Sequence, residues 1–593
     1  MRNEISQRHC ESHFVELRAR MGCGNPILKN QQFNYAKSRL PRRGQPQINA
    51  SLLAITLYFG LSFPILKMIV QKYSKAGLAA TVMRLTIMYI PRLNFLFFLL
   101  LNLQVCYSQK TSPLSKREGL VARKLYFSTS GSDNNDGTIN HPFNSISKFN
   151  NLDFVAGDKI YFKGGETFNG SMFIDSTKSG TSKKNIEISS YGNGKAIINS
   201  GNLTAFLLYK TKFIQVNNLK FIGVGRKNGN TKDGVRIDNS DNISIKNIDV
   251  SGFQKSGLFI YSSSNIKATN VYAHENGAAG IAVDGAYSIK ESNYNIYIDN
   301  CTAENNPGDP TNLNNHSGNG IVVGNCKKVM IEYCTATNNG WDMPRIGNGP
   351  VGIWAYEADS VIIQHCLSYR NKTSVGGADG GGFDFDGGVT NSIIQYCLSY
   401  ENQGAGYSIF QYLYATPWYN NIFRFNISEN DGSVSDSKAG VYIWNSSRDS
   451  NQFYNCFFYN NTIYNSKGFA LTYSELSEHK NFSFYNNIFI GEDSLIRGIK
   501  GVDVFVGNDW WCLKNKLPGK IVGLNINLVF KNPGNAKITS AKQLNQFFNY
   551  QLPQSSLLKN KGINLYKQYK INNGGIDFLS KPIITNGIGA CLN

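Results

Sequence analysis

Two aspartates that stand two residues apart, Asp384 and Asp386, are the best candidates for acid–base chemistry in this chain of 593 residues. They alternate with phenylalanines in the segment 382–386, so an extended strand places both carboxyl groups on one face. Their Cα atoms would lie about 6.5–7 Å apart, within the roughly 5–9.5 Å range of carboxyl pairs that cleave glycosidic bonds. Neighbouring negative charge and aromatic surroundings would raise the pKa of one carboxyl group, as a general acid near neutrality requires. This spacing permits hydrolysis and leaves retention and inversion both open.

Large aromatic rings occupy the equivalent outward positions of neighbouring segments. Sugars pack their apolar faces on such rings, so we expect a glycan-binding groove around the two aspartates. Glu357 and Glu401 are further candidates for the catalytic acids. The residues expected to bind the substrate are Trp354, Tyr356, Phe410, Tyr442, Trp444 and Arg370.

A glycine followed by four alternating residues recurs nine times between Gly234 and Thr472. A period-2 strand that returns without a helical pattern between its copies indicates stacked coils. A second recurring phrase precedes the glycines, and we interpret each coil as two strands joined by an Asn-rich bend and a glycine turn. The nine phrases begin at Gly234, Gly257, Gly280, Gly320, Gly352, Gly382, Gly406, Gly440 and Gly468.

Two columns of the second phrase predict what fills the coils. Asparagines recur at one position, and stacking at about 4.8 Å would bring them into an amide ladder. Cysteines recur at another position, where Val271 stands one coil earlier, which predicts packed, reduced thiols and no zinc site. The two sets are Asn276, Asn306, Asn339, Asn371 and Asn402, and Cys301, Cys334, Cys366 and Cys397.

The region between Tyr126 and Gly201 resembles the N-terminal part of many secreted β-helix enzymes. Its Asp- and Gly-rich loop at 126–138 and its strand-opening turn at Gly157-Asp158 carry the similarity. Together with the repeats, residues 124–593 resemble the right-handed parallel β-helix of the pectate-lyase-like superfamily, in its secreted, bacterial, carbohydrate-active form. The resemblance implies an all-β chain folded as a single-stranded right-handed parallel β-helix of about ten or more coils with an N-terminal cap.

The resemblance leaves the reaction open, because this fold carries lyases, hydrolases, epimerases and adhesins. Our first expectation is a polysaccharide-degrading glycoside hydrolase without a cofactor. One alternative is a Ca²⁺-dependent uronate lyase, in which Asp379, Asp384 and Asp386 bind the ion and an Arg or Lys is the base. A second alternative is a non-catalytic glycan-binding or adhesin-like surface protein. Aspartates beside the glycine-rich segment 376–382 can also serve only to accept hydrogen bonds from backbone amides.

The chain divides into five expected segments. Residues 1–82 have no repeat, and we interpret them as a non-core extension from an early start, although the apolar run 50–70 approaches membrane-spanning length. Residues 83–108 have the basic and apolar regions of a signal peptide, with Cys106 as an alternative lipoprotein cysteine. We then expect an N-terminal cap and first coils at 109–205, β-helix repeats at 206–490, and irregular last coils with a C-terminal cap at 491–593. These segments predict a secreted mature protein with no membrane span.

The formal net charge of +20 suggests a nucleic-acid partner at first sight. More than half of the excess lies in residues 1–108, outside the expected coils, and neither a basic helix nor an aromatic RNA-binding motif is present. A modest positive charge on the coils favours an acidic glycan instead. We therefore expect a polysaccharide or oligosaccharide partner, no nucleic acid, and a monomer.

Overall fold

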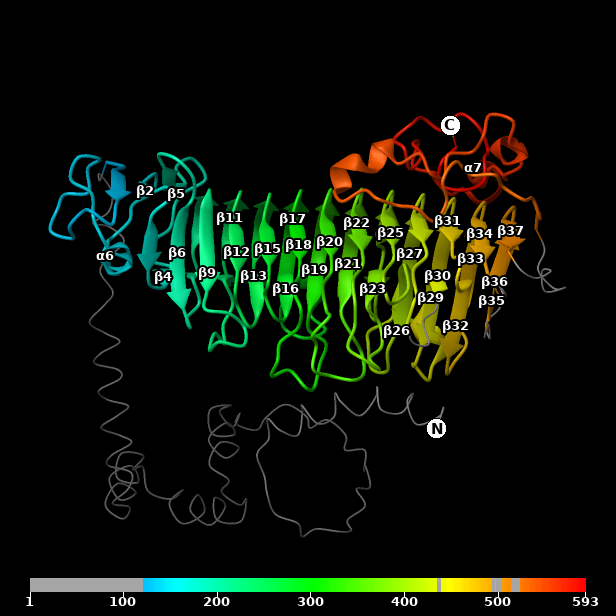
Figure 1. The fold of residues 1–593 in the computed structure, drawn as a ribbon, viewed down its shortest axis with the longest axis horizontal. Coiled ribbons are helices and arrows are strands. Elements are labelled where there is room, and N and C mark those ends of the chain that lie inside the picture. Colours follow the sequence, from blue (N-terminus) through cyan, green and yellow to red (C-terminus); the bar gives the residue numbers. More distant parts are fainter. Residues whose placement is uncertain (1–120, 435–438, 493–495, 498–502, 514–522, 593) are drawn as a thin grey trace, which may run out of the picture. The chain divides into compact units, whose positions relative to one another are not determined.

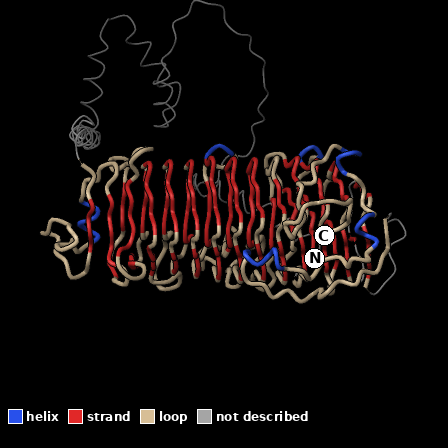
Figure 2. Tube along the Cα trace, turned by 90° about the horizontal axis from the view of Figure 1, so that it is seen from above, coloured by secondary structure: helices blue, strands red, loops and turns tan. Residues whose placement is uncertain are grey.

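The computed structural model describes residues 121–434, 439–492, 496–497, 503–513 and 523–592. Parallel strands of successive coils stack side by side along the chain (Figures 1 and 2). The predicted right-handed parallel β-helix is confirmed. Each coil, however, has three strands and not the two expected from the sequence. Each copy of the second phrase contains two short strands, separated by a left-handed residue such as His365 (φ 49°) or Tyr396 (φ 56°).

We name the three faces of the solenoid by their strands. The glycine face, which holds the glycine phrases, comprises β4 (Met172–Ile174), β7 (Phe206–Tyr209), β10 (Val235–Asp238), β13 (Ser256–Tyr261), β16 (Ala279–Asp284), the first halves of β19 (Asn319–Glu332) and β21 (Val351–Gln364), β23 (Gly381–Phe385), β26 (Tyr407–Gln411), β29 (Ala439–Asn445), β32 (Phe469–Glu475) and β35 (Ile496–Arg497).

The second face comprises β1 (Lys124–Phe127), β2 (Lys159–Lys163), β5 (Ile186–Tyr191), β8 (Lys212–Asn217), β11 (Asp241–Lys246), β14 (Ser264–Thr269), β17 (Asn293–Asp299), the second halves of β19 and β21, β24 (Ile393–Gln395), β27 (Trp418–Arg424), β30 (Phe453–Tyr459), β33 (Lys480–Tyr485) and β36 (Asp503–Val506). The third face comprises β3 (Thr167–Asn169), β6 (Ala196–Gly201), β9 (Leu219–Gly223), β12 (Asp249–Ser251), β15 (Tyr272–His274), β18 (Thr302–Glu304), β20 (Thr335–Thr337), β22 (Leu367–Tyr369), β25 (Leu398–Tyr400), β28 (Ile427–Glu429), β31 (Thr462–Tyr464), β34 (Ile488–Gly491) and β37 (Asp509–Cys512).

Helices are few and short in the part of the chain that the structure describes. They are the α-helices α6 (Ile146–Asn151) and α7 (Leu565–Tyr569) and the 3-10 turns η2 (Lys290–Ser292), η3 (Ser450–Gln452), η4 (Ala541–Gln546) and η5 (Leu557–Asn560). Within the described ranges, no helix is long and apolar enough to cross a membrane.

Close packing inside the coil explains why glycine begins each repeat. A Cβ atom added to Gly352 would lie 2.0 Å from the Ser368 hydroxyl, and one added to Gly382 would lie 2.1 Å from the Ser399 hydroxyl. The third face therefore leaves no room for a side chain at this position. The strand register differs from the sequence prediction only at the last of the nine phrases. Val441 pairs with Leu471, so the residue beside Gly440 is Ala470 and not the predicted Gly468.

The predicted amide ladder is confirmed and ends on an acid. Nδ2 of each asparagine donates to Oδ1 of the next from Asn276 to Asn402, at 2.8–3.2 Å. Asn402 then donates to a carboxylate oxygen of Asp431 at 2.9 Å. The ladder satisfies polar groups inside the solenoid, where an unpaired amide would be costly.

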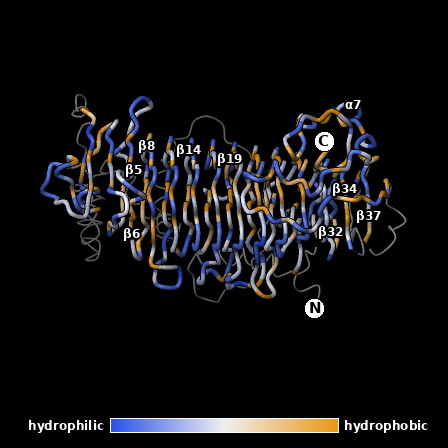
Figure 3. Tube along the Cα trace, turned by 45° about the horizontal axis from the view of Figure 1, so that its top comes forward, coloured by the Kyte–Doolittle hydropathy of each residue, from blue (hydrophilic) through white to orange (hydrophobic). Residues whose placement is uncertain are grey.

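The cysteine column forms a comparable ladder of free, buried thiols, as predicted. The backbone N–H of Cys301 donates to Sγ of Cys334, and this contact repeats at 3.4 Å up to Cys397. The Cys397 N–H donates to Oδ1 of Asn426, so asparagine continues the column at 3.0 Å. In this column, thiol and amide side chains therefore both accept a hydrogen bond from the backbone N–H of the preceding coil. Hydrophobic and hydrophilic residues both occur along the stacked strands (Figure 3).

The C-terminal segment 523–592 folds back along the solenoid and does not form coils (Figure 1). Its apolar residues pack on Leu367, Leu398 and Ile427 of the third face. Backbone and side-chain hydrogen bonds anchor it, including those that Ala536 N–H and Tyr550 hydroxyl donate to the Glu429 carboxylate at 2.6 and 2.8 Å. This segment therefore covers part of the third face.

Candidate functional site

Asp384 lies on β23, in the middle of the glycine face, and Asp386 directly follows the last residue of that strand. Asp384 pairs with Trp354 of β21 on one side and with Ser408 of β26 on the other. Phe383 and Phe385 point into the core and are fully buried, as the alternation predicts. Asp384 and Asp386 therefore share a rung on the outer side of the strand.

The carboxyl groups of Asp384 and Asp386 differ in their exposure to solvent. Asp384 is 2% exposed, and its Oδ1 has no hydrogen-bond partner in the part of the chain that the structure describes. Burial, and next the charges of Asp386 and Asp379, raise the pKa of Asp384 well above its usual value. Asp386 is half-buried and accepts a hydrogen bond from the Gly387 N–H at 2.7 Å. Burial raises the pKa of Asp386 to about 7, with help from Asp379 and Glu357.

Asp379 precedes the rung in a left-handed backbone conformation (φ 58°). One of its oxygens accepts a hydrogen bond from the Gly349 N–H at 2.7 Å, and burial raises its pKa to about 6. The lyase alternative assigns calcium to Asp379, Asp384 and Asp386. No group of three or more His, Cys, Asp or Glu side chains in the described ranges is arranged to hold a metal ion.

Glu357 lies next to the rung, where both of its carboxylate oxygens have partners. They accept hydrogen bonds from the Thr416 N–H at 2.9 Å and the Thr416 hydroxyl at 2.6 Å. The Glu357 N–H in turn donates to the Gly387 carbonyl at 2.8 Å. Glu357 therefore connects β21 to the loop after β26, and its charge acts on Asp386.

The predicted aromatic residues differ in accessibility. Trp354 is 4% exposed, donates from Nε1 to Asn319 at 3.0 Å and packs edge-on against His316. Phe410 is also buried, beneath the rings of Tyr442 and Trp444. The expectation of an exposed ring is therefore wrong for Trp354 and Phe410, since loops and neighbouring rings cover them.

The remaining aromatic residues, Tyr356, Tyr442 and Trp444, are half-buried and keep part of their surface. They can still contact a ligand on the glycine face.

Glu401 and Arg370 lie elsewhere. They follow third-face strands β25 and β22, are exposed, and form an ion pair with each other at 2.7 Å. They line a separate depression of about 530 Å³ together with Glu304 and Lys372. The fold therefore does not bring them to the aspartate rung, because the left-handed residues at 370 and 401 end the third face before the chain reaches the glycine face.

Sequence reasoning missed Lys290, which reaches the site from the loop between β16 and β17. Its ammonium group donates to the Gly388 carbonyl, two residues past Asp386, and to the Thr390 hydroxyl at 3.3 Å. Burial lowers the pKa of Lys290 although Glu357 and Asp359 oppose the shift. No spacing in the sequence links residues about 100 positions apart, so only the folded loop reveals this contact.

Tyrosines of two loops were also missed. Tyr287 and Tyr412 form a hydrogen bond to each other, and both lie within the electrostatic reach of Asp386. Burial and then the charge of Asp386 raise the pKa of Tyr412 well above its usual value. These hydroxyls remain protonated donors near the rung at neutral pH.

A buried charge cluster lies at the far end of the glycine face. His479 is held between Glu475 at 2.5 Å from Nδ1 and Asp503 at Nε2, and the Tyr473 hydroxyl also donates to Asp503. Burial alone would lower the pKa of His479, but hydrogen bonds to Asp503 and Glu475 raise it to about 9. The cluster stabilises the last coils and is separate from the aspartate rung.

Fold and site together define a right-handed parallel β-helix with a carboxylate rung on one outer face. Residues 125–481, more than half of the chain, match the protein family described as the Pel9A-like right-handed β-helix region, and the chain belongs to this family. No curated protein matches the chain.

Several solved structures are similar to this chain at low identity. The GH136 lacto-N-biosidase from Eubacterium ramulus is 17% identical with a TM-score of 0.44, covering 65% of this chain and 67% of that one. A rhamnogalacturonan lyase is 18% identical with a TM-score of 0.43, covering 54% of this chain and 87% of that one. Pectate lyase Pel9A is 15% identical with a TM-score of 0.40, covering 80% of this chain and 97% of that one. Likeness at this level does not identify a reaction.

Proposed function

We propose that this protein is a secreted polysaccharide-degrading enzyme that hydrolyses glycosidic bonds at the Asp384–Asp386 rung. The observation that carries the proposal is the difference between the two carboxyl groups. Asp384 is 2% exposed with no hydrogen-bond partner at Oδ1 within the described ranges, and burial raises its pKa well above the usual value, whereas Asp386 is half-buried, accepts the Gly387 N–H, and has a pKa raised to about 7. A pair of carboxyl groups in opposite protonation states supplies a base or nucleophile together with an acid.

The roles follow from the order of ionisation. Asp386, which retains exposed surface, acts in its ionised form on water or on the sugar carbon. Asp384 donates its proton to the departing glycosidic oxygen, which requires the bound glycan to displace part of the cover over this carboxyl group. Tyr356, Tyr442 and Trp444 offer the partly exposed rings on which neighbouring sugars can pack.

The test is a product assay with neutral and uronate polysaccharides, with and without a chelator. Hydrolysis releases reducing ends without absorbance near 235 nm and is insensitive to the chelator. Asp386→Asn and Asp384→Asn should each lower the rate at least about 100-fold, the usual size of an acid–base contribution. Glu187→Gln, which removes an acid of β5 on the second face, is the matched control and should leave the rate unchanged.

A uronate lyase is the second candidate, and Lys290 is the observation that favours it. Lys290 is half-buried beside the rung, and burial lowers its pKa, so it gives up its proton more readily than an ordinary lysine and can act as the base that a lyase needs at C5. Products that absorb near 235 nm, and their loss in Lys290→Met, would replace the hydrolase proposal with this one.

Glycan binding without any product would instead favour a binding or adhesin-like protein. In that case Asp386→Asn would leave glycan affinity unchanged and no activity would be lost.

A further inference from the structure

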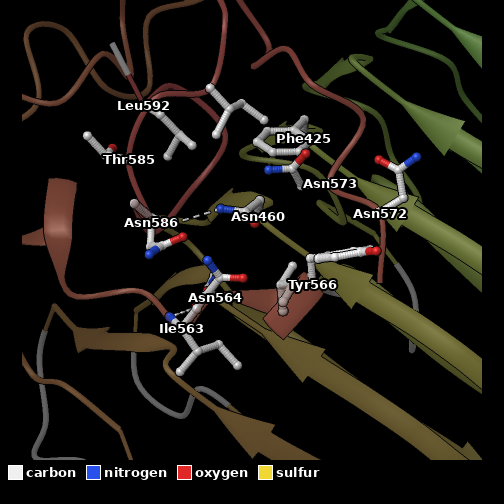
Figure 4. Close-up of a pocket in the computed structure, with 14 residues that line it drawn as sticks. Phe425, Asn460, Ile563, Asn564, Tyr566, Asn572, Asn573, Thr585, Asn586 and Leu592 are labelled. Carbon is white, nitrogen blue, oxygen red and sulfur yellow. Dashed lines mark hydrogen bonds between the residues drawn. The ribbon is translucent and has the colours of Figure 1, made fainter. Parts of the chain in front are cut away.

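A cavity of about 240 Å³ lies between the C-terminal segment and the solenoid. Its floor is formed by Phe425, Asn460 and Asn486, all left-handed residues that turn the chain from the second face to the third face. Its other walls come from residues 563–592, including α7 (Figure 4). Because one liquid water occupies about 30 Å³, the space is large enough for an organic ligand the size of a single sugar ring.

The lining is polar but carries no formal charge. It contains no Asp, Glu, Lys, Arg or His, and its polar groups are largely asparagine amides. Figure 4 shows the amides of Asn460, Asn564, Asn573 and Asn586 arranged around the cavity. An uncharged lining of this kind gives an anion or a cation no counter-charge, so a charged ligand would lose its hydration without compensation.

Some of these amides are engaged in the fold, and others keep free groups. Asn460 donates from Nδ2 to the Gly587 carbonyl at 2.9 Å, and Oδ1 of Asn564, Asn572 and Asn573 accepts backbone N–H groups at 2.8–3.1 Å. Among the described residues, Nδ2 of the latter three has no hydrogen-bond partner. These free donors can bind hydroxyl oxygens.

Three further side chains complete the set. The Thr585 hydroxyl is buried without a hydrogen-bond partner in the described part of the chain. A buried unpaired hydroxyl is costly, and a ligand hydroxyl would satisfy it. Tyr566, on α7, lines the same cavity and is 67% exposed, with the Lys570 ammonium group over its ring at 5.4 Å from the ring centre. Asn586 adds a side-chain amide without a partner among the described residues.

We propose that this cavity is a binding site for one residue of a neutral sugar, outside the catalytic face. Amide groups pair with hydroxyls that both donate and accept, an exposed tyrosine ring packs on the apolar face of a pyranose, and the uncharged lining selects against uronates. The inference concerns binding alone and does not rest on the proposed hydrolysis.

The experiment measures binding to the full chain by saturation-transfer NMR and by calorimetric titration. The probes are methyl β-D-glucopyranoside, methyl β-D-galactopyranoside and galacturonate. Tyr566→Ala, Thr585→Val and Asn586→Ala remove groups that make no hydrogen bond within the described fold, and each should weaken binding of a neutral glycoside at least fivefold. Phe548→Ala, which removes another exposed ring of the C-terminal segment, is the matched control and should bind normally.

Trp444→Ala separates this cavity from the glycine face. Binding of a neutral glycoside that survives Trp444→Ala and is lost in the cavity variants supports the proposal. Binding only of galacturonate, binding that is lost in Trp444→Ala but retained in the cavity variants, or no binding of any probe would overturn it. Thermal unfolding of each variant shows that a loss of binding is not a loss of fold.

Discussion

Replacing Asp431 with asparagine should stabilise the protein at pH 8 and change its stability little near pH 4. Asp431 occupies the last position of the amide ladder, where Asn402 donates to it from both its backbone N–H and its Nδ2 at 2.9 Å. The Ser428 hydroxyl donates to its other oxygen at 2.7 Å. An asparagine keeps one acceptor for Asn402 and presents Nδ2 to the Ser428 hydroxyl, which can rotate to accept.

The magnitude follows from the pKa of this buried carboxyl group. Burial raises the pKa of Asp431 from 3.8 to about 7. Between these values the unfolded chain has released its proton while the folded chain still holds it, so rising pH favours the unfolded state. The difference of about 3 pKa units corresponds to roughly 4 kcal/mol as an upper bound, fully developed above pH 7. Asp431→Asn has no carboxyl group to ionise and so does not lose this stability as the pH rises.

Urea unfolding of the wild type and Asp431→Asn at pH 4 and pH 8 measures the effect. We expect the two midpoints to agree at pH 4 and the variant to be higher at pH 8. Asp153→Asn, which changes an exposed acid, should track the wild type at both values. A variant that is destabilised equally at both pH values would show that Asp431 is held as a carboxylate, contrary to this reasoning.

Three other predictions concern different parts of the fold. The hydrolytic rate should rise with pH through about 7 as Asp386 ionises, and a pH profile that lacks this limb would contradict its role as the base. Glu429→Ala should lower the free energy of unfolding by about 1–3 kcal/mol, because the Ala536 N–H and the Tyr550 hydroxyl lose their acceptor. It should also speed proteolysis of the C-terminal segment. Unchanged proteolysis would mean that other contacts hold this segment in place. The His479 cluster should stabilise the fold fully below pH 6.5 and lose this contribution as the pH rises through about 9. The difference in the free energy of unfolding between the wild type and His479→Gln should therefore narrow over that pH range. A constant difference would refute a histidinium paired with the two carboxylates.

The sequence by itself determined the coil and much of what fills it. Alternation at Phe383 and Phe385 assigned the inward and outward positions of β23, and the recurring Asn and Cys columns identified ladders that the structure contains. These inferences succeed because a stacked solenoid repeats local chemistry at a fixed spacing, so a column in the sequence becomes a column in space. The same regularity made Asp384 and Asp386 visible as an exceptional rung.

Tertiary structure decided what surrounds that rung. Loops of different lengths cover Trp354, bring Lys290 to Gly388, and place Arg370 with Glu401 on another side of the coil. The C-terminal segment returns across many coils to enclose a cavity that no local pattern indicates. Such contacts join residues that are far apart in the sequence, and their burial sets the pKa values on which the chemistry depends. Periodicity therefore predicts the scaffold, and the irregular loops and the terminal segment determine the site.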